Sequence, residues 1–75
     1  PATGLPSWQR DALGRVSWAQ RQVLLRMDDW PRHVLLLHLV ERLSATEICA
    51  RLNVPHTRVK PLLSGCAALI AAVTA

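Results

Sequence analysis

The chain has 75 residues, of which 51% are hydrophobic and 19% are charged. This length gives one small domain, and the hydrophobic content excludes a disordered tail, which would be poorer in apolar residues. The formal net charge of +4 is compatible with an acidic partner such as nucleic acid, whereas no apolar run reaches the ~18–20 residues that span a membrane.

The N-terminal segment, residues 1–6, contains two Pro and one Gly and shows no helical periodicity. We therefore expect a disordered end or a linker stub, followed by one domain over residues 7–75. The chain begins with Pro1 instead of Met and shows no signal peptide, which predicts either a processed chain or a piece of a longer protein.

The two cysteines, Cys49 and Cys66, both lie in apolar stretches with helical spacing. Two cysteines do not form the disulfide framework of a small secreted domain. The sequence therefore predicts buried free thiols in a reducing compartment, and hence a cytoplasmic protein.

Residues 8–27 carry apolar side chains at helical spacing and predict a helical segment with Ser7 as its N-cap. Ser17 and Gln20 have the spacing of a capping box, in which each side chain bonds the backbone N–H of the other residue. The segment is therefore predicted to divide into two helices, with a break near Val16.

Trp18 and Leu25 project from the side of this segment opposite its main apolar stripe. Two interpretations are open. Either they pack against a neighbouring helix, or they form part of a partner-binding surface.

The sequence Asp28-Asp29-Trp30-Pro31 predicts a helix start, because acidic residues favour the N-terminal end of a helix and Pro is tolerated there. We expect this helix to run to about Arg42. It is apolar nearly all round, which is typical of a central, surrounded helix, through Leu35, Leu36, Leu37, Leu39 and Val40. The alternation of strands is absent throughout, so the predicted fold is all-α, with four or five short helices.

The segment 43–60 predicts two short helices that meet at a tight turn, a helix-turn-helix. Ser44 and Glu47 form a Ser-x-x-Glu capping box. One apolar face follows at helical spacing, made of Ala45, Ile48, Cys49 and Leu52. Asn53 is expected to end the helix in the left-handed conformation. Pro55 disfavours the α conformation at the residue before it, so the same helix cannot continue.

A last helix is predicted from an apolar stripe that runs to the C-terminus, made of Val59, Leu62, Leu63, Cys66, Leu69, Ile70 and Val73. Pro within a helix costs ~3 kcal/mol, and less near its start. We therefore expect Thr57 to be the N-cap, which places Pro61 at the fourth helical position.

Residues 34–60 resemble region 4 of bacterial sigma factors, closest to the extracytoplasmic-function group. That family typically has an apolar helix ending in a Glu-Gly-Leu-Ser-like turn, a Glu-Ile-Ala helix, a Leu-Gly-Val-Ser turn and a Thr-Val-Lys opening of the recognition helix. The matching residues here are Val34 to Leu37, Val40 to Ser44, Glu47 to Cys49, Leu52 to Pro55, and Arg58 to Lys60.

The resemblance implies a small helical domain that binds promoter DNA through its recognition helix and also contacts core RNA polymerase or an anti-sigma protein. The residues then expected to contact DNA are Arg51, His56, Thr57, Arg58, Lys60 and Ser64. The last helix departs from the family pattern, because residues 61–75 carry no charged side chain. Arg and Lys supply phosphate contacts and bidentate contacts to guanine, so the recognition helix is expected to be degenerate.

The face of the last helix opposite its apolar stripe consists mainly of small residues. Small side chains let another backbone approach, so Ala68 and Ala71 are candidate partner-binding residues and a homo-oligomer is one possible use. The alternative is that Ala is simply the best helix former.

The sequence offers no candidate catalytic residue, metal ligand or cofactor site. Cys49 is expected on a buried helix face, which does not suit a nucleophile. His33 and His38 are five residues apart and therefore lie on different helix faces, and no Cys-x-x-Cys is present.

Three hypotheses follow. The first is a sigma-like domain that binds promoter DNA, and the second is a sigma-like protein-interaction module that no longer reads DNA. In the second case the docking partner would be polymerase, an anti-sigma protein or another part of the same chain. The third is a helical module unrelated to transcription.

Overall fold

The computed structural model describes residues 5–66, and every regular element in this range is helical. The elements are the α-helices α1 (Ser7–Leu13), α2 (Trp18–Leu25), α3 (Asp29–Leu39) and α4 (Ala45–Leu52), the 3-10 helix η2 (His56–Arg58) and the π-helix η3 (Leu62–Cys66). The predicted all-α fold is confirmed. Within the described range no helix is both long and apolar enough to cross a bilayer.

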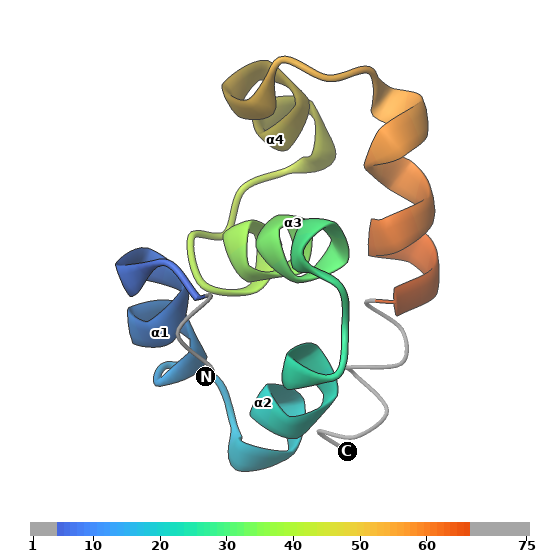
Figure 1. The fold of residues 1–75 in the computed structure, drawn as a ribbon. Helices are drawn as coiled ribbons and strands as arrows, with labels where there is room; N and C mark the ends of the chain where they lie inside the picture. The colour runs from blue at the N-terminus through green and yellow to red at the C-terminus, as the bar shows by residue number, and fades with distance from the viewer. Residues whose placement is uncertain (1–4, 67–75) are drawn as a thin grey trace.

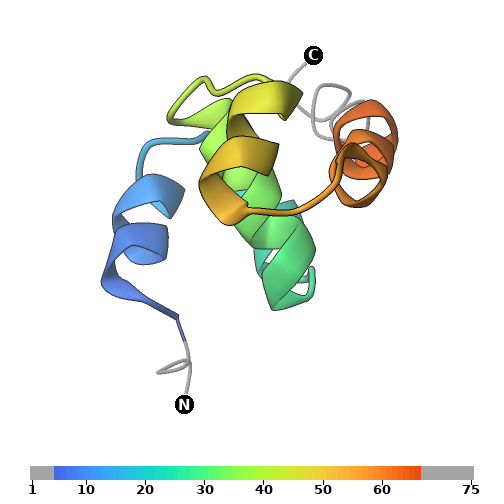
Figure 2. The same ribbon diagram turned by 90° about the horizontal axis from the view of Figure 1, so that it is seen from above.

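Helix α3 occupies the middle of the molecule and packs against α1, α4 and η3, as Figures 1 and 2 show. It contributes residues to both hydrophobic clusters of the core. One cluster consists of Ala12, Leu13, Leu24, Leu35 and Leu36, and the other of Val34, Leu37, Ile48, Cys49 and Val59. The prediction of a central, surrounded helix is therefore confirmed, and Cys49 is a buried free thiol.

The first helical segment divides into α1 and α2, as the second capping box predicts. Ser17 Oγ accepts a hydrogen bond from the Gln20 N–H at 3.0 Å, and Gln20 Oε1 accepts one from the Ser17 N–H at 3.0 Å. The prediction of Ser7 as the first N-cap is wrong by one residue. The N-cap is Pro6, whose carbonyl accepts from the N–H of Gln9 at 3.0 Å, so Ser7 is already helical.

Helix α3 ends at Leu39, three residues before the predicted end at Arg42. Arg42 has a φ of 59°, in the left-handed region, and the following Leu43 N–H donates to the Leu37 carbonyl at 3.2 Å. His38 Nδ1 lies 2.9 Å from the Leu43 carbonyl oxygen. These bonds turn the chain back, so that Leu43 packs against the cluster containing Ile48.

Helix α4 begins and ends as predicted. Ser44 Oγ accepts from the Glu47 N–H at 3.2 Å, and a Glu47 carboxylate oxygen accepts from the Ser44 N–H at 2.9 Å. The hydrogen bonds from Ser44 hold the pKa of Glu47 below its ordinary value of 4.5. Asn53 ends the helix with a φ of 57°. Ile48 and Cys49 are buried, while Leu52 is only partly buried.

The prediction of Thr57 as the N-cap of the last helix is wrong. The helical segment begins earlier, as the 3-10 helix η2 with Pro55 as N-cap, and Val59 ends that turn with its side chain fully buried. Regular helix resumes at Lys60, so Pro61 lies in a first turn, where its missing N–H costs little. The predicted stripe residues Leu69, Ile70 and Val73 lie outside the described residues, as do Ala68 and Ala71.

Candidate nucleic-acid interface

The segment from α4 to η3 presents most of the residues expected to contact DNA. The chain leaves α4 through left-handed Asn53, runs extended at Pro55 and enters η2. Helix α4 and the following helical segment lie across one another rather than alongside, as the two views in Figures 1 and 2 agree. Thr46 Oγ1 and His56 Nε2 lie 3.3 Å apart, so the start of α4 is linked directly to the start of η2.

Arg58 is held against the protein by an aromatic ring. Its guanidinium carbon lies 4.4 Å from the centre of the Trp30 ring, at the N-terminal end of α3. This cation–π contact is favourable and restricts the side chain, yet Arg58 remains exposed. The guanidinium is therefore positioned on the surface and is still available to an anion.

The other residues of this segment are exposed as well. His56, Thr57 and Lys60 lie on the surface, and so does Ser64. The Ser64 hydroxyl donates to the Lys60 carbonyl at 2.9 Å, one turn back along its own helix. Its oxygen can still accept a hydrogen bond, but its proton is already engaged.

Arg51 lies apart from the other five residues. Thr46 faces η2, and a residue five positions further along an α-helix points about 140° away around the axis. Arg51 instead lines a groove of about 390 Å³ between α1, α3 and α4. The other lining residues are Trp8, His33, Leu37, Glu41 and Leu52. The structure thus brings together His56, Thr57, Arg58, Lys60 and Ser64 on one segment, without Arg51.

His33 lines the groove and is partly buried. The rings of Trp8 and His33 meet edge to face, with centroids 4.7 Å apart. Burial lowers the pKa of His33 below its ordinary value of 6.5, because it disfavours the charged imidazolium more than the nearby Asp29 carboxylate favours it. The groove wall is mainly apolar through Trp8, Leu37 and Leu52, and Glu41 and Arg51 are its charged lining residues.

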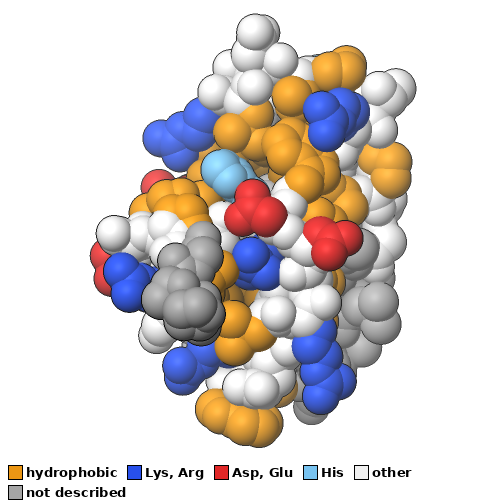
Figure 3. Space-filling model, viewed as in Figure 1, with side chains coloured by type: hydrophobic (Ala, Val, Ile, Leu, Met, Phe, Trp, Pro, Cys, Tyr) orange, Lys and Arg blue, Asp and Glu red, His pale blue; other side chains and the backbone are white. Residues whose placement is uncertain are grey.

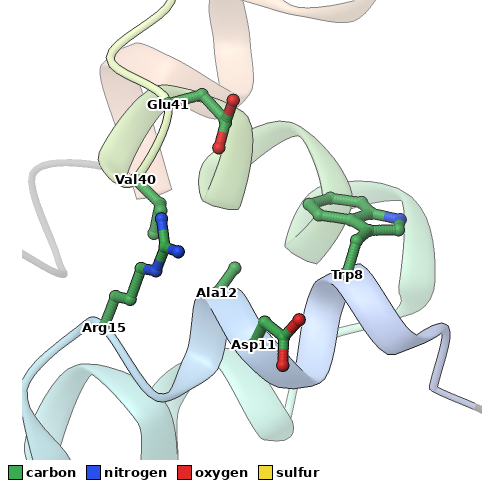
Figure 4. A pocket seen from close by; sticks show the side chains of 6 residues that line it. All are labelled: Trp8, Asp11, Ala12, Arg15, Val40 and Glu41. Carbon is green, nitrogen blue, oxygen red and sulfur yellow. The ribbon is translucent and has the colours of Figure 1, made fainter.

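A second, smaller pocket of about 180 Å³ lies between α1 and the end of α3. In Figure 4, Glu41 points toward α1, and Arg15 points from the end of α1 toward Val40. The pocket is also lined by Trp8, Asp11 and Ala12. Two carboxylates and one guanidinium give its wall a net negative charge, so it does not suit a phosphate.

The basic side chains do not form one continuous patch on the face shown in Figure 3. Lys and Arg side chains stand apart from one another there, and hydrophobic side chains gather between them over the upper half of the molecule. A long, sequence-independent track along a nucleic acid is therefore absent from this face. Phosphate contacts on this face would be confined to separate Lys and Arg side chains.

Trp18 and Leu25 are exposed, with 71% and 43% of their surfaces accessible. The interpretation that they pack against a neighbouring helix is therefore wrong for the described residues. The core contact of α2 is made by Leu24, which is fully buried. A partner-binding role for Trp18 and Leu25 stays a prediction.

Sequence reasoning missed two residues that shape the interface, Trp30 under Arg58 and Thr46 beside His56. Both contacts join residues at least 10 positions apart in the chain, and no helical periodicity relates them. Among the residues described, no group of three His, Cys, Asp or Glu side chains is placed to hold a metal ion.

In comparisons with known proteins, no family model, no curated protein and no solved structure matches this chain.

Proposed function

We propose that the segment from α4 to η3 is the helix-turn-helix of a domain similar to region 4 of sigma factors, and that it binds duplex DNA in transcription. One observation carries the proposal. The non-glycine residues with positive φ in the described chain are Arg42, at 59°, and Asn53, at 57°. The sigma pattern has glycine at both of these places, and glycine adopts this conformation without strain.

The agreement is informative because Arg has no preference for the left-handed region. A chain that keeps this backbone turn without the glycine has kept the geometry on which the pattern depends. Both turns border α4. They therefore fix where this helix starts and the direction in which the chain leaves it toward the next helical segment. This supports the resemblance at the level of backbone shape, independently of the side chains that match.

Arg58 and Lys60 are the phosphate contacts that we propose, since both are exposed cations on this segment. His56 and Thr57 precede them and are exposed, and we propose that they approach base edges. With two cations, binding is expected to be weak and to position the domain without specifying much sequence. A transcription role of this kind also places the protein in the cytoplasm.

A fluorescence anisotropy titration of a labelled mixed-sequence duplex tests the proposal. The logarithm of the affinity should fall with the logarithm of the salt concentration at a slope of about −1.8, at ~0.9 for each of two phosphates neutralised. The R58A/K60A double variant should lose most of this binding. A selection from a random duplex pool should find discrimination below the ~10³-fold of specific binders.

A matched control removes two positive charges elsewhere. Arg10 and Arg15 are exposed on or next to α1, and the R10A/R15A variant should retain nearly all of the duplex affinity. Equal losses in the two variants would show that net charge, not this segment, binds DNA. No binding by the wild type at low salt would overturn the proposal.

A second candidate function is docking to a protein, namely core RNA polymerase or an anti-sigma protein. The observation that favours it is the mainly apolar groove between α1, α3 and α4, of about 390 Å³. Apolar grooves of this kind accept amphipathic helices. The uncharged sequence of residues 61–75 also fits a domain whose interactions are more with proteins than with phosphates.

Two charge reversals separate the candidates. Arg51 lines the groove, whereas Lys60 lies on the segment proposed to bind DNA. R51E should weaken binding to purified core polymerase and leave duplex binding little changed, and K60E should do the reverse. Polymerase binding that is insensitive to R51E would exclude the groove as the docking site.

A further inference from the structure

Helix α2 presents a second exposed surface, at the opposite end of the molecule from α4. Trp18 is 71% exposed and Leu25 is 43% exposed, and Arg21 lies between them in the sequence. In Figure 3 the end of the molecule formed by α2 shows hydrophobic side chains with Lys or Arg side chains on either side. Arg21 and Arg26 flank the side of the helix that carries Trp18 and Leu25, about 60° and about 80° around the axis from Trp18 in opposite directions. The surface formed by Trp18, Leu25 and these two flanking Arg side chains is called the α2 face below.

The α2 face is fixed to the core, and its charged side chains are both basic. Ser17 and Gln20 close a capping box at the start of α2, and Leu24 fixes the helix to the core from its buried side. No Asp or Glu occurs between Asp11 and Asp28. Among the described residues Arg32 and Asp29 form a salt bridge, whereas no carboxylate forms one with Arg21 or Arg26.

We propose that the α2 face binds unpaired nucleic acid, with a base stacked on the Trp18 ring and backbone phosphates held by Arg21 and Arg26. Every base has a flat face that stacks on an aromatic ring, and guanidinium groups neutralise the phosphates on either side. This proposal does not rest on duplex binding at the other end of the molecule.

The size and charge of the surface favour this ligand over two others. A stable protein interface buries roughly 800 Å² on each partner around an apolar core, which one indole and one half-exposed Leu do not supply. A helix that lies in a membrane interface has a broad apolar face, whereas α2 has eight residues and its Val23 and Leu24 pack in the core. One aromatic ring with two cations is sufficient for a stacked nucleotide.

The test uses a labelled thymidine oligonucleotide of about 16 nucleotides, a length that covers a typical single-strand site. The whole chain should bind it with a salt slope of about −1.4, at ~0.7 for each of two phosphates. W18A should weaken binding about 5- to 140-fold, the loss of one stacked base. W18F should restore most of the affinity, because the aromatic ring is retained.

Three comparisons make the outcome decisive. An abasic oligonucleotide with the same number of phosphates should bind as weakly as the thymidine oligonucleotide binds W18A. R58A/K60A should leave single-strand binding unchanged, and W18A should leave duplex binding unchanged, so the two surfaces are tested separately. Circular dichroism and urea unfolding confirm that each variant is folded, which the exposure of Trp18 leads us to expect.

The proposal is overturned by no binding of the thymidine oligonucleotide at low salt, or by equal binding of the abasic strand, which would show simple charge attraction. Equal or tighter binding of a polyglutamate peptide would show that the surface serves an acidic protein instead. Loss of single-strand binding in R58A/K60A but not in W18A would assign the strand to the segment that follows α4.

Discussion

The side chain of Arg32 on α3 donates a hydrogen bond from Nε to Gln9 Oε1 on α1, at 2.9 Å, and both residues are buried. Arg32 Nη1 also donates to the Met27 carbonyl at 2.7 Å, just after α2. The same guanidinium lies 3.5 Å from the Asp29 carboxylate. One buried charge therefore joins α1, the α2–α3 connection and the start of α3.

The first prediction tests this buried pair. Q9L keeps the approximate size of the side chain but leaves Arg32 Nε without its acceptor, so the free energy of unfolding should fall by ~1–3 kcal/mol. Q22L, at a half-exposed position on α2, should change it by less than ~0.5 kcal/mol. Urea unfolding measures both.

The double variant Q9L/R32M provides the internal check, because replacing both partners by apolar groups can be nearly neutral. It should be more stable than Q9L alone. If the double variant loses as much as the two single variants together, the hydrogen bond between Arg32 and Gln9 is not the source of the effect.

A second prediction concerns three serines near helix starts. Ser17 and Ser44 close capping boxes, whereas the Ser7 side chain caps nothing. S17A and S44A should each cost about 0.5–2 kcal/mol. S7A is the matched control and should be close to neutral, as measured by thermal or urea unfolding. A cost for S7A equal to that of S44A would argue against the cap assignment.

The third prediction concerns backbone strain at Arg42, whose φ is 59°. The left-handed conformation costs an ordinary L-residue roughly 1–2 kcal/mol, and Gly avoids that cost. R42G should therefore stabilise the protein by up to ~1 kcal/mol. N53G should gain less, because Asn tolerates this conformation.

The control for Arg42 is an arginine in regular helix. Arg51 lies inside α4, and R51G should destabilise the protein by ~1 kcal/mol, the usual cost of Gly in a helix. Destabilisation by R42G of the same size as by R51G would mean that Arg42 is not in the left-handed region in solution.

A fourth prediction follows from the lowered pKa of His33. In the unfolded chain the group titrates near its ordinary value of 6.5, and in the folded protein it titrates lower. The folded state therefore binds the proton less readily, and stability is complete above about pH 6.5 and falls as the pH drops through the folded pKa.

The measurement compares urea unfolding at about pH 7.5 and about pH 5 for the wild type and H33Q. The wild type should lose more stability than H33Q between these two values. His38 and His56 are present in both proteins, so the difference isolates His33. An equal loss would show that the burial of His33 does not oppose its protonation.

Much of the fold could be predicted from the sequence because its signals are local. A capping box is made within three residues, and the left-handed end of a helix at Asn53 depends on that residue and its neighbours. Helix α3 is apolar nearly all round, and a helix of this kind is stable only when it is surrounded by other elements. Its central position therefore follows from its sequence. The break between α1 and α2 has the same local origin.

The early end of α3 and the surroundings of the candidate site were decided by tertiary structure. Glu41 and Arg42 are good helix formers, so propensity does not predict an end at Leu39. The chain turns there, and Leu43 packs against the cluster that contains Ile48. Arg58 contacts Trp30, and Arg51 lines a groove together with residues of α1 and α3. These residues are far apart in the sequence, and no helical periodicity relates them. Propensity and capping act within about one helical turn, whereas the side to which a surface residue turns is set by which helices pack around it.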